Sequence, residues 1–318
     1  MNTQTSSDHA ALQKGGVRFA PSPTGRFHLG NLRTAWISWR FAQELGVPWV
    51  VRFEDIDKPR VSAGAADLQL ADMASLGLRP TSIVVQSLRV LRHFELFELA
   101  RASGAIYACN CSRKDVQTAL EGLASASHDG HAPVYSGHCR QHPVDASAAG
   151  AIAWRFKMPG NGSHDFIIAR TNSLASATDI NAFTPAYHWA CAIDDFDGAY
   201  DLIVRSVDLA TALPLQRAIQ SALPTWELQN TNAARTTNSR LIRAFHTSLV
   251  TQDDGHRLEK RTEGVTLHEL ATNGWPPARL LEAFERSFDS QLLSLQTFNS
   301  DGIAREPRET LKLSELLH

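Results

Sequence analysis

The sequence predicts a doubly wound α/β protein, in which helices cover both faces of a parallel sheet, with an inserted α+β module and a short C-terminal helical region. Three observations support this fold class. A strand, a turn, a helix and a second strand follow one another within residues 16–53, which is the order that joins parallel neighbours. A strand-to-helix pattern returns at 199–223. Between them, the segment 106–185 changes character and contains few strands.

The N-terminal unit begins with "GVRFA" (16–20), which reads as a short strand, and continues into the turn "PSPTGRFHLG". Apolar residues then recur at helical spacing, with Asn31 as the expected N-cap. "VPWVVRF" (47–53) is an apolar run of strand length, broken only by one arginine. Ligands of doubly wound sheets bind at the carboxyl ends of the strands. We therefore expect His28 and the carboxylates of "EDID" (54–57) on one rim.

The remaining segments complete the division of the chain. Two helices are expected within 64–105, and only 151–158 and 165–170 look like strands in the inserted module. Residues 226–240 are polar and loop-like, and the chain from 263 onward is helical by pattern. We predict a discontinuous sheet domain at 16–105 and 186–262, an inserted module at 106–185 and a C-terminal helical region at 263–318.

Composition sets limits on the function. No apolar run approaches the ~18–20 residues that cross a bilayer, and the polar start lacks the apolar stretch of a secretory signal, so we expect a cytoplasmic protein without a membrane partner. The formal net charge is −2, so a nucleic acid would have to be held by a local patch. Four cysteines in 318 residues do not indicate a disulfide framework.

The turn before the first long helix has the features of a phosphate site. Helix N-termini carry unpaired N–H groups and a partial positive charge, and glycine lets the backbone approach a ligand closely. His28 would donate to a phosphate oxygen whose charge grows as a nucleotide's α–β bond breaks. The alternative is a tight loop with an incidental histidine. The coincidence of strand, two prolines, glycine and helix start favours a site.

Three of the cysteines lie close enough in sequence to suggest a metal. Cys109-x-Cys111 is followed by Tyr135-x₃-Cys139, and thiolates in a tetrahedral arrangement are the usual structural zinc environment. The residues alone leave the fourth ligand open. Tyr135 fits the core equally well, and a histidine, His131 or His138, would then take its place.

These motifs resemble those of glutamyl-tRNA synthetases and of their truncated paralogs, the glutamyl-queuosine tRNA(Asp) synthetases. The similarity is carried by "RFAPSPTGRFHLGN" (18–31), "VRFEDIDKPR" (51–60), "IYACNCSRKDV" (106–116), "AYHWACAIDDFDGAYDLIVRSVDL" (186–209) and "DGHRLEKR" (254–261), and it covers most of 16–262. The resemblance implies a class I ligase with a Rossmann-type catalytic domain that uses ATP and Mg²⁺.

The resemblance also implies a glutamate site. A substrate with two carboxylates and one ammonium needs two cationic contacts and one anionic contact, and arginine pairs with carboxylates in a bidentate manner. The family assigns the carboxylates to Arg18 and Arg205, the ammonium to Glu54, and further hydrogen bonds to Ser22 and Tyr187. The bare sequence independently places the two arginines and Glu54 near strand ends.

For ATP, the resemblance implies contacts in the turn and in a mobile loop whose counterpart here is "RLEK". In this motif Glu259 puts a carboxylate where the family has a serine, next to the expected position of the ATP phosphates. Two like charges ~4 Å apart repel by roughly 4 kcal/mol at an effective dielectric of ~20. Glu259 therefore either points away from the phosphates or slows activation, and Arg261 would compensate. The implied catalytic residues are His28, Arg257 and Lys260, and the implied ATP contacts are Pro21, Thr24, His28, Gly30, Asn31, Arg257, Leu258 and Lys260.

The truncated paralogs carry the C-x-C…Y-x₃-C pattern as a zinc site, so the resemblance implies structural zinc on Cys109, Cys111, Tyr135 and Cys139. Cys191 occupies a family position that varies with tRNA specificity and is expected to be a small buried hydrophobe. In the family, the inserted module contacts the acceptor and the C-terminal region contacts the tRNA stem.

The length after the mobile loop indicates the subclass. The chain ends at His318, so we expect it to lack the anticodon-binding region of full glutamyl-tRNA synthetases. We expect a monomer that takes L-glutamate and ATP and attaches glutamate to the queuosine base at the wobble position of tRNA(Asp). Two alternatives stay open: a glutamate-activating enzyme that loads a different acceptor (a tRNA end, a carrier protein or a metabolite), and a catalytically weak regulatory paralog.

Overall fold

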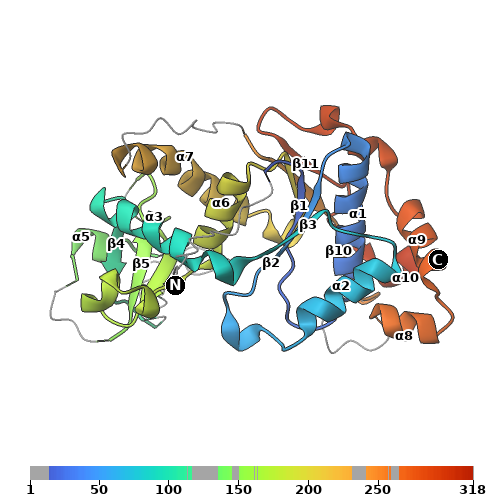
Figure 1. Cartoon of the computed structure of the whole chain (residues 1–318), viewed down its shortest axis with the longest axis horizontal. Coiled ribbons are helices and arrows are strands. Elements are labelled where there is room, and N and C mark those ends of the chain that lie inside the picture. Colours follow the sequence, from blue (N-terminus) through green and yellow to red (C-terminus); the bar gives the residue numbers. More distant parts are fainter. Residues whose placement is uncertain are drawn as a thin grey trace, which may run out of the picture. The chain divides into compact units, whose positions relative to one another are not determined.

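The computed structural model describes residues 14–112, 114–116, 135–144, 150–160, 162, 164–230, 241–256, 258 and 265–317. The chain divides into two compact units (Figure 1). The first consists of Met1–Leu88, Asp195–Thr211 and Asn238–His318, and the second of Arg89–Asp194 and Ala212–Thr237. Both units are therefore discontinuous in sequence.

The first unit is built on a parallel sheet with the order β11-β9-β8-β1-β2-β3. The chain leaves β1 toward β2 and β3 on one side, and later continues from β8 toward β9 and β11 on the other. This reversal between β1 and β8 is the switch point at which doubly wound sheets bind ligands, and the predicted parallel sheet is confirmed. The strands are β1 (Val17–Phe19), β2 (Trp49–Phe53), β3 (Ser82–Val85), β8 (Leu202–Ser206), β9 (Arg243–Thr247) and β11 (Ile303–Arg305).

Helix α1 (Leu29–Leu45) covers one face of this sheet (Figure 1). It ends at Gly46, whose φ of 62° is a left-handed conformation that glycine adopts without a Cβ penalty. Trp36 packs against Phe284 with ring centroids 5.8 Å apart, and Phe41 packs against Phe245 at 4.8 Å. The other helices of the unit are α2 (Ala65–Ser75), α8 (Leu267–Thr272), α9 (Pro277–Arg286) and α10 (Leu313–Leu317), with 3₁₀ turns η1 (Lys58–Arg60), η5 (Val207–Leu209), η6 (Ser290–Leu293) and η7 (Leu295–Thr297).

The N-cap predicted for α1 is wrong. The helix begins at Leu29, and the capping residue is His28, whose Nδ1 accepts a hydrogen bond from the backbone N–H of Asn31 at 3.4 Å. Asn31 thus belongs to the first turn. An imidazole nitrogen can cap a helix start as a carboxamide does, so the cap falls one turn earlier than the commonest capping residues indicate.

The C-terminal region is not purely helical, which corrects the prediction for 263–318. β11 joins the edge of the main sheet, and β12 (Thr310–Lys312) pairs in parallel with β10 (Leu249–Thr251). Three-residue strands carry too short a pattern to be recognised in sequence. Glu306, just after β11, accepts from Arg33 of α1 at 2.8 and 2.6 Å and from the backbone N–H of Ser248 at 2.6 Å. This buried ion pair joins α1 to the C-terminal strand.

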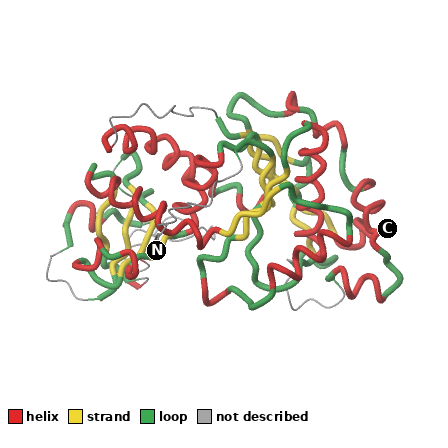
Figure 2. Tube along the Cα trace, in the orientation of Figure 1, coloured by secondary structure: helices red, strands yellow, loops and turns green. Residues whose placement is uncertain are grey.

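The second unit contains an antiparallel sheet in the order β4-β5-β6-β7, with strands shown in yellow in Figure 2. Its strands are β4 (Ile106–Cys109), β5 (Ile152–Phe156), β6 (Phe166–Thr171) and β7 (Thr184–Pro185), so both strands predicted in the insert are confirmed. The helices are α3 (Val90–Ala102), α5 (His138–Gln141) and α7 (Ala212–Asn230), with 3₁₀ turns η3 (Ala175–Thr178) and η4 (Ile180–Ala182). Two elements cross the unit boundary, η2 (Gln86–Arg89) and α6 (Tyr187–Gly198).

Aromatic side chains form the core of the second unit. Phe97 packs against Trp154 with centroids 5.2 Å apart and against Phe183 at 5.0 Å. Trp226 is buried and packs against Trp189 at 5.8 Å. This burial extends α7 to Asn230, so the loop predicted from 226 is wrong up to that residue, and 231–240 lies outside the described residues. Among the described helices, none is both long and apolar enough to span a bilayer.

Candidate functional site

The strands of the first unit place arginines on one face of the sheet. Arg18 of β1 is in register with Val50 of β2, two residues before Arg52, and with Ile203 of β8, two residues before Arg205. Side chains alternate along a strand and in-register neighbours share a face, so Arg18, Arg52 and Arg205 share one face, which we call the arginine face. The opposite face carries Val17, Phe19, Val51 and Val204, which belong to the same apolar cluster as Leu32 and Trp36 of α1.

A buried carboxylate joins two of these arginines. Asp195 accepts from Arg18 at two atoms, from Nε at 3.0 Å and from Nη2 at 2.6 Å, and it also accepts from Arg52 Nη1 at 2.6 Å. Arg52 Nη2 in turn donates to Glu54 Oε1 at 3.0 Å. Burial works to raise the pKa of Asp195, but Arg18 and Arg52 outweigh it and hold the pKa below its ordinary value. Asp195 is therefore ionised at neutral pH.

Arg205 lies at the carboxyl end of β8, next to the switch point. Its side chain is 4% exposed, and its Nε lies 3.4 Å from Nε2 of His246, its in-register neighbour on β9. Three of the predicted glutamate ligands, Arg18, Glu54 and Arg205, thus lie in the first unit at the carboxyl ends of adjacent central strands. Such an arrangement can hold a dicarboxylic amino acid by paired charges.

The other predicted glutamate contacts are placed differently. Ser22 is exposed on the turn after β1. Tyr187, 38% exposed, is the first residue of α6 and belongs to the second unit. Of the remaining "EDID" carboxylates, Asp55 accepts from the N–H and hydroxyl of Ser87 at 2.7 and 2.6 Å, while Asp57 is exposed. Of these three described carboxylates, Glu54 is the one that accepts a hydrogen bond from the arginine face, from Arg52.

The turn that leads to His28 is held in place by α2. Gln69 Nε2 donates to the carbonyl oxygens of Ser22 and Gly25 at 3.2 and 2.7 Å. Arg26 donates to Asp72 at 2.6 Å. Burial raises the pKa of Asp72, and Arg26 offsets this only in part. Pro21 accepts from the N–H of Glu54 at 2.9 Å, which couples the turn to the strand end that carries the expected ammonium ligand.

The segment that follows the "RLEK" motif returns to His28. The N–H of Leu29 donates to the carbonyl of Val265 at 2.9 Å, and His28 and Thr266 form an isolated antiparallel bridge. Leu258 is buried in the core of the first unit. Arg257, Glu259, Lys260 and Arg261 lie outside the described residues, and their predicted roles stay predictions.

Gly30, the second residue of α1, lies against the imidazole. A Cβ at this position would lie 3.1 Å from His28 Cε1, 3.2 Å from His28 Nδ1 and 3.3 Å from Val250 Cβ. These distances are shorter than ordinary van der Waals contacts, so the imidazole would have to move by a few tenths of an ångström. The absence of a side chain at Gly30 therefore allows the present position of His28.

If His28 has the predicted catalytic role, we expect Gly30→Ala to lower the rate of the predicted amino-acid activation on the order of tenfold, because displacing a catalytic group by a fraction of an ångström weakens transition-state contacts. Alanine is a better helix former than glycine, so the free energy of unfolding should stay equal or rise. Pyrophosphate exchange and urea denaturation measure the two quantities. An unchanged rate would show that His28 does not depend on this contact.

The three predicted cysteine ligands come together in the second unit. The sulfur atoms of Cys109, Cys111 and Cys139 all lie within 4.8 Å of one another, and Cys111 and Cys139 approach to 3.3 Å. The hydroxyl oxygen of Tyr135 lies 3.7 Å from Cys109 Sγ and accepts from the N–H of Cys139 at 2.8 Å. Zn–S bonds of ~2.3 Å in a tetrahedron separate sulfurs by roughly 3.8 Å, so this donor set fits zinc.

The charges around the cluster also fit a cation. Burial, reinforced by the neighbouring thiols, raises the pKa of Cys111 to about 12. Arg155 donates from Nε to Cys109 Sγ at 3.2 Å, and its guanidinium lies 3.6 Å from the centre of the Tyr135 ring. Burial opposes ionisation of Cys109, but the contact with Arg155 outweighs it and lowers the pKa. Arg155 supplies a positive charge beside Cys109 only, and a divalent ion would supply the positive charge needed to stabilise thiolates at Cys111 and Cys139.

Of the two alternative metal ligands, His138 is described and is not a member of this cluster. The ring of His138 stacks on that of His142 with centroids 4.7 Å apart, and His131 lies outside the described residues. Cys191 is 1% exposed within α6 and is not a member of the cluster, as expected for a buried small hydrophobe.

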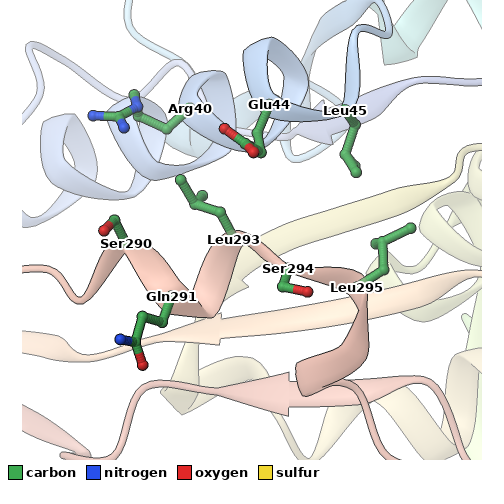
Figure 3. Close-up of a pocket in the computed structure, with 8 residues that line it drawn as sticks. All are labelled: Arg40, Glu44, Leu45, Ser290, Gln291, Leu293, Ser294 and Leu295. Atoms are coloured by element: carbon green, nitrogen blue, oxygen red, sulfur yellow. The ribbon is translucent and has the colours of Figure 1, made fainter.

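A surface pocket of about 500 Å³ lies elsewhere in the first unit (Figure 3). It lies between the second half of α1 and η6 with η7, and Leu293 points toward α1 (Figure 3). Arg40, one of its lining residues, is about 18 Å from His28 along α1 at ~1.5 Å per residue. The pocket is therefore separate from the arginine face and the helix start.

Sequence reasoning missed Arg52, Asp195 and His246. The signal for Arg52 was present, because an arginine interrupted an otherwise apolar strand, and a fully buried arginine needs a carboxylate partner. Asp195 lies on α6 and His246 on β9. Only the fold brings these two residues to Arg18 and Arg205.

Comparison with known proteins gives consistent matches. The family "tRNA synthetases class I (E and Q), catalytic domain" matches residues 16–316. The chain is 34% identical over 271 residues to a glutamyl-Q tRNA(Asp) synthetase from Deinococcus radiodurans, covering 83% of this chain and 85% of the relative. It is 32% identical over 299 residues to a glutamyl-Q tRNA(Asp) synthetase from Burkholderia cenocepacia, covering 84% and 92%.

Among solved structures, a glutamate-tRNA synthetase from Elizabethkingia anophelis matches with a TM-score of 0.64 at 19% identity. The match covers 96% of this chain but 65% of that longer one. A methionyl-tRNA synthetase from Mycobacterium tuberculosis matches with a TM-score of 0.56 at 9% identity. At these identities the likeness shows a shared fold.

Proposed function

The chain belongs to the family of class I tRNA synthetases for glutamate and glutamine, and on that premise we propose that this ligase activates glutamate with ATP and transfers it to the queuosine base at the wobble position of tRNA(Asp). The observation that carries the proposal is the arginine face. Arg18, Arg205 and Glu54 lie at the carboxyl ends of three adjacent strands, beside the switch point of the sheet.

In the first step, an oxygen of the glutamate α-carboxylate attacks the α-phosphorus of ATP, and the bond to the bridging oxygen breaks to release pyrophosphate. His28 and the positive end of the α1 dipole stabilise the charge that develops on the phosphates. Mg²⁺ accompanies ATP, and Arg257 with Lys260 would neutralise the leaving group. The reaction needs positioning and electrostatic stabilisation rather than a protein nucleophile.

In the second step, a hydroxyl of the queuosine cyclopentenediol attacks the activated carbonyl carbon. The ester bond forms as the bond from the carbonyl carbon to the AMP oxygen breaks, and the proton of the hydroxyl leaves with AMP. The relatives named glutamyl-Q tRNA(Asp) synthetases support this acceptor, because this chain covers 85% and 92% of two of them.

We further propose that Cys109, Cys111, Cys139 and Tyr135 hold one zinc ion with a structural role. Structural zinc sites have four protein ligands and no open position, and this set provides four. Zinc would hold the inserted module together, and no step of the reaction passes through it.

The decisive experiment measures incorporation of radiolabelled glutamate into tRNA from cells with and without queuosine. We expect incorporation only into queuosine-containing tRNA, at tRNA(Asp). Incorporation into queuosine-free tRNA, or into no tRNA although pyrophosphate exchange occurs, would show a different acceptor. Absence of glutamate-dependent exchange of pyrophosphate into ATP would overturn the activation step itself and would favour a regulatory paralog.

A further inference from the structure

We infer that Asp195 is a positioning residue of the glutamate site, which orients Arg18 for the substrate carboxylate and, through Arg52, Glu54 for the substrate ammonium. The inference rests on the proposed function and extends it to a residue that does not itself contact glutamate. Its basis is a continuous chain of charge-assisted contacts, buried up to Arg52 and part-buried at Glu54, that runs Arg18–Asp195–Arg52–Glu54.

The contact of Asp195 with Arg18 fixes the plane of the guanidinium. It uses both Nε and Nη2, at 3.0 and 2.6 Å, and the two side chains are 1% and 4% exposed. A bidentate pair defines direction as well as distance. Asp195 occupies the Nε–Nη2 edge of Arg18, so a substrate carboxylate has to approach from the Nη1 side.

The same carboxylate also sets the position of the ammonium ligand. Asp195 Oδ1 accepts from both Arg18 Nε and Arg52 Nη1. Arg52 also donates from its other terminal nitrogen, Nη2, to Glu54, and so limits the position of the Glu54 carboxylate. The two groups expected to hold opposite charges of one amino acid are thereby tied to one anchor. The separation between them is fixed before substrate arrives, which lowers the cost of ordering on binding.

The anchor itself is rigid. Asp195 lies in the last turn of α6, and the chain leaves this helix through a tight exit at Gly198 and Ala199. A Cβ at Gly198 would lie 2.5 Å from Tyr200 Cζ, and Ala199 adopts a φ of 48°. Tyr200 is fully buried and contacts Val50 and Val84 of the sheet. The chain just after α6 is therefore packed against β2, which carries Arg52, and against β3.

Because Asp195 is charged, two explanations of its role predict opposite changes in the KM for glutamate when the charge is removed. If Asp195 acted only through its electric field, Asp195→Asn would remove a negative charge near an anion site and would lower the KM for glutamate. If Asp195 positions Arg18, the same substitution releases the guanidinium and raises the KM for glutamate. We expect a rise of about tenfold or more, as for other losses of a buried charged partner, with the KM for ATP changed less than about twofold.

The experiment is glutamate-dependent pyrophosphate exchange by the full chain, with each substrate varied in turn. Asp201→Asn is the matched control. It removes the same charge from the same unit, but Asp201 accepts from the N–H of Gly16 at the amino ends of the strands, away from the rim, and both KM values should stay at the wild-type level. Urea denaturation checks that each variant is folded.

Asp195→Glu is measured alongside, because it keeps both buried arginines neutralised if the asparagine variant does not fold. Its longer side chain shifts the Arg18 plane, so the KM for glutamate should again rise while the KM for ATP does not. An unchanged or lowered KM for glutamate in a folded Asp195 variant would overturn the inference. A wild-type protein without glutamate-dependent exchange would instead overturn the proposed function, so the two failures are distinguishable.

Discussion

Replacing Arg205 with leucine is expected to reduce glutamate-dependent exchange of pyrophosphate into ATP by about 100-fold or more, while ATP binding stays close to the wild-type level. Removing one partner of a buried, hydrogen-bonded charge pair costs about 2–5 kcal/mol, and each ~1.4 kcal/mol is a factor of ten. Arg205 is 4% exposed beside the switch point, so little water is present there to replace its charge.

Arg243→Leu is the matched control for this variant. Arg243 begins β9, the strand next to β8, and thus lies at the amino ends of the strands. The same loss of a cation there should leave the exchange rate within about twofold of wild type. ATP binding, followed by equilibrium dialysis, separates the two substrates. Undiminished exchange in Arg205→Leu, or equal loss of ATP binding, would contradict the role of Arg205 in holding glutamate.

The residues of the site that the sequence predicts lie in segments whose secondary structure is clear from the local pattern of apolar residues. Strand β1, the turn and α1 follow one another within a short stretch, and the periodicity of apolar residues changes from strand to helix within it. Parallel strands end at a common rim, so Arg18, Glu54 and Arg205 could be expected near one another once a parallel sheet was predicted, and the family resemblance assigned them to glutamate.

The unpredicted part depends on contacts between distant segments. Asp195 is 177 residues from Arg18 and 143 from Arg52 in the chain, and an aspartate on a helix is most often solvent-exposed. No local pattern indicates which acid will neutralise a buried arginine. The strand β11 was missed for a related reason, because its three residues gain their partner only when the sheet has formed.

The cysteine cluster was predicted as far as spacing allows. Cys109, Cys111 and Cys139 are brought together as expected, and the structure places the Tyr135 hydroxyl beside them rather than His138. The sequence could not indicate Arg155, since β5 pairs with β4 only in the folded module. Ion occupancy stays a proposal, and it leads to the second large effect.

Replacing Cys139 with serine is expected to lower bound zinc from about one ion per chain to near zero and to destabilise the second unit. A serine hydroxyl stays protonated at neutral pH, whereas zinc ligands must be deprotonated. The local apolar cluster consists of Cys109, Tyr135, Cys139 and Ala153, so three of its four buried residues are the proposed ligands. Without the ion, the buried packing that remains there is two thiols, a phenol and one alanine, with the partly buried Tyr107, Val116, Val144 and Ile167 against it.

Zinc binding contributes on the order of 10 kcal/mol in small domains that depend on it, so loss of even part of this should lower the midpoint of thermal unfolding by more than about 10 °C. Hydrogen exchange should rise in β4, β5 and β6 and stay unchanged in β1, β2 and β8 of the other unit. Metal analysis, calorimetry and peptide-resolved exchange measure the three quantities.

Cys191→Ala is the matched control, because it removes a buried cysteine of the same unit that is not a member of the cluster. This variant should keep its zinc, and its exchange protection in β4 and β5 should match the wild type. If the wild-type protein contained no zinc, the donor set would have to be stabilised by Arg155 alone. There would then be no ion to lose, and Cys139→Ser would leave the second unit as stable as the wild type.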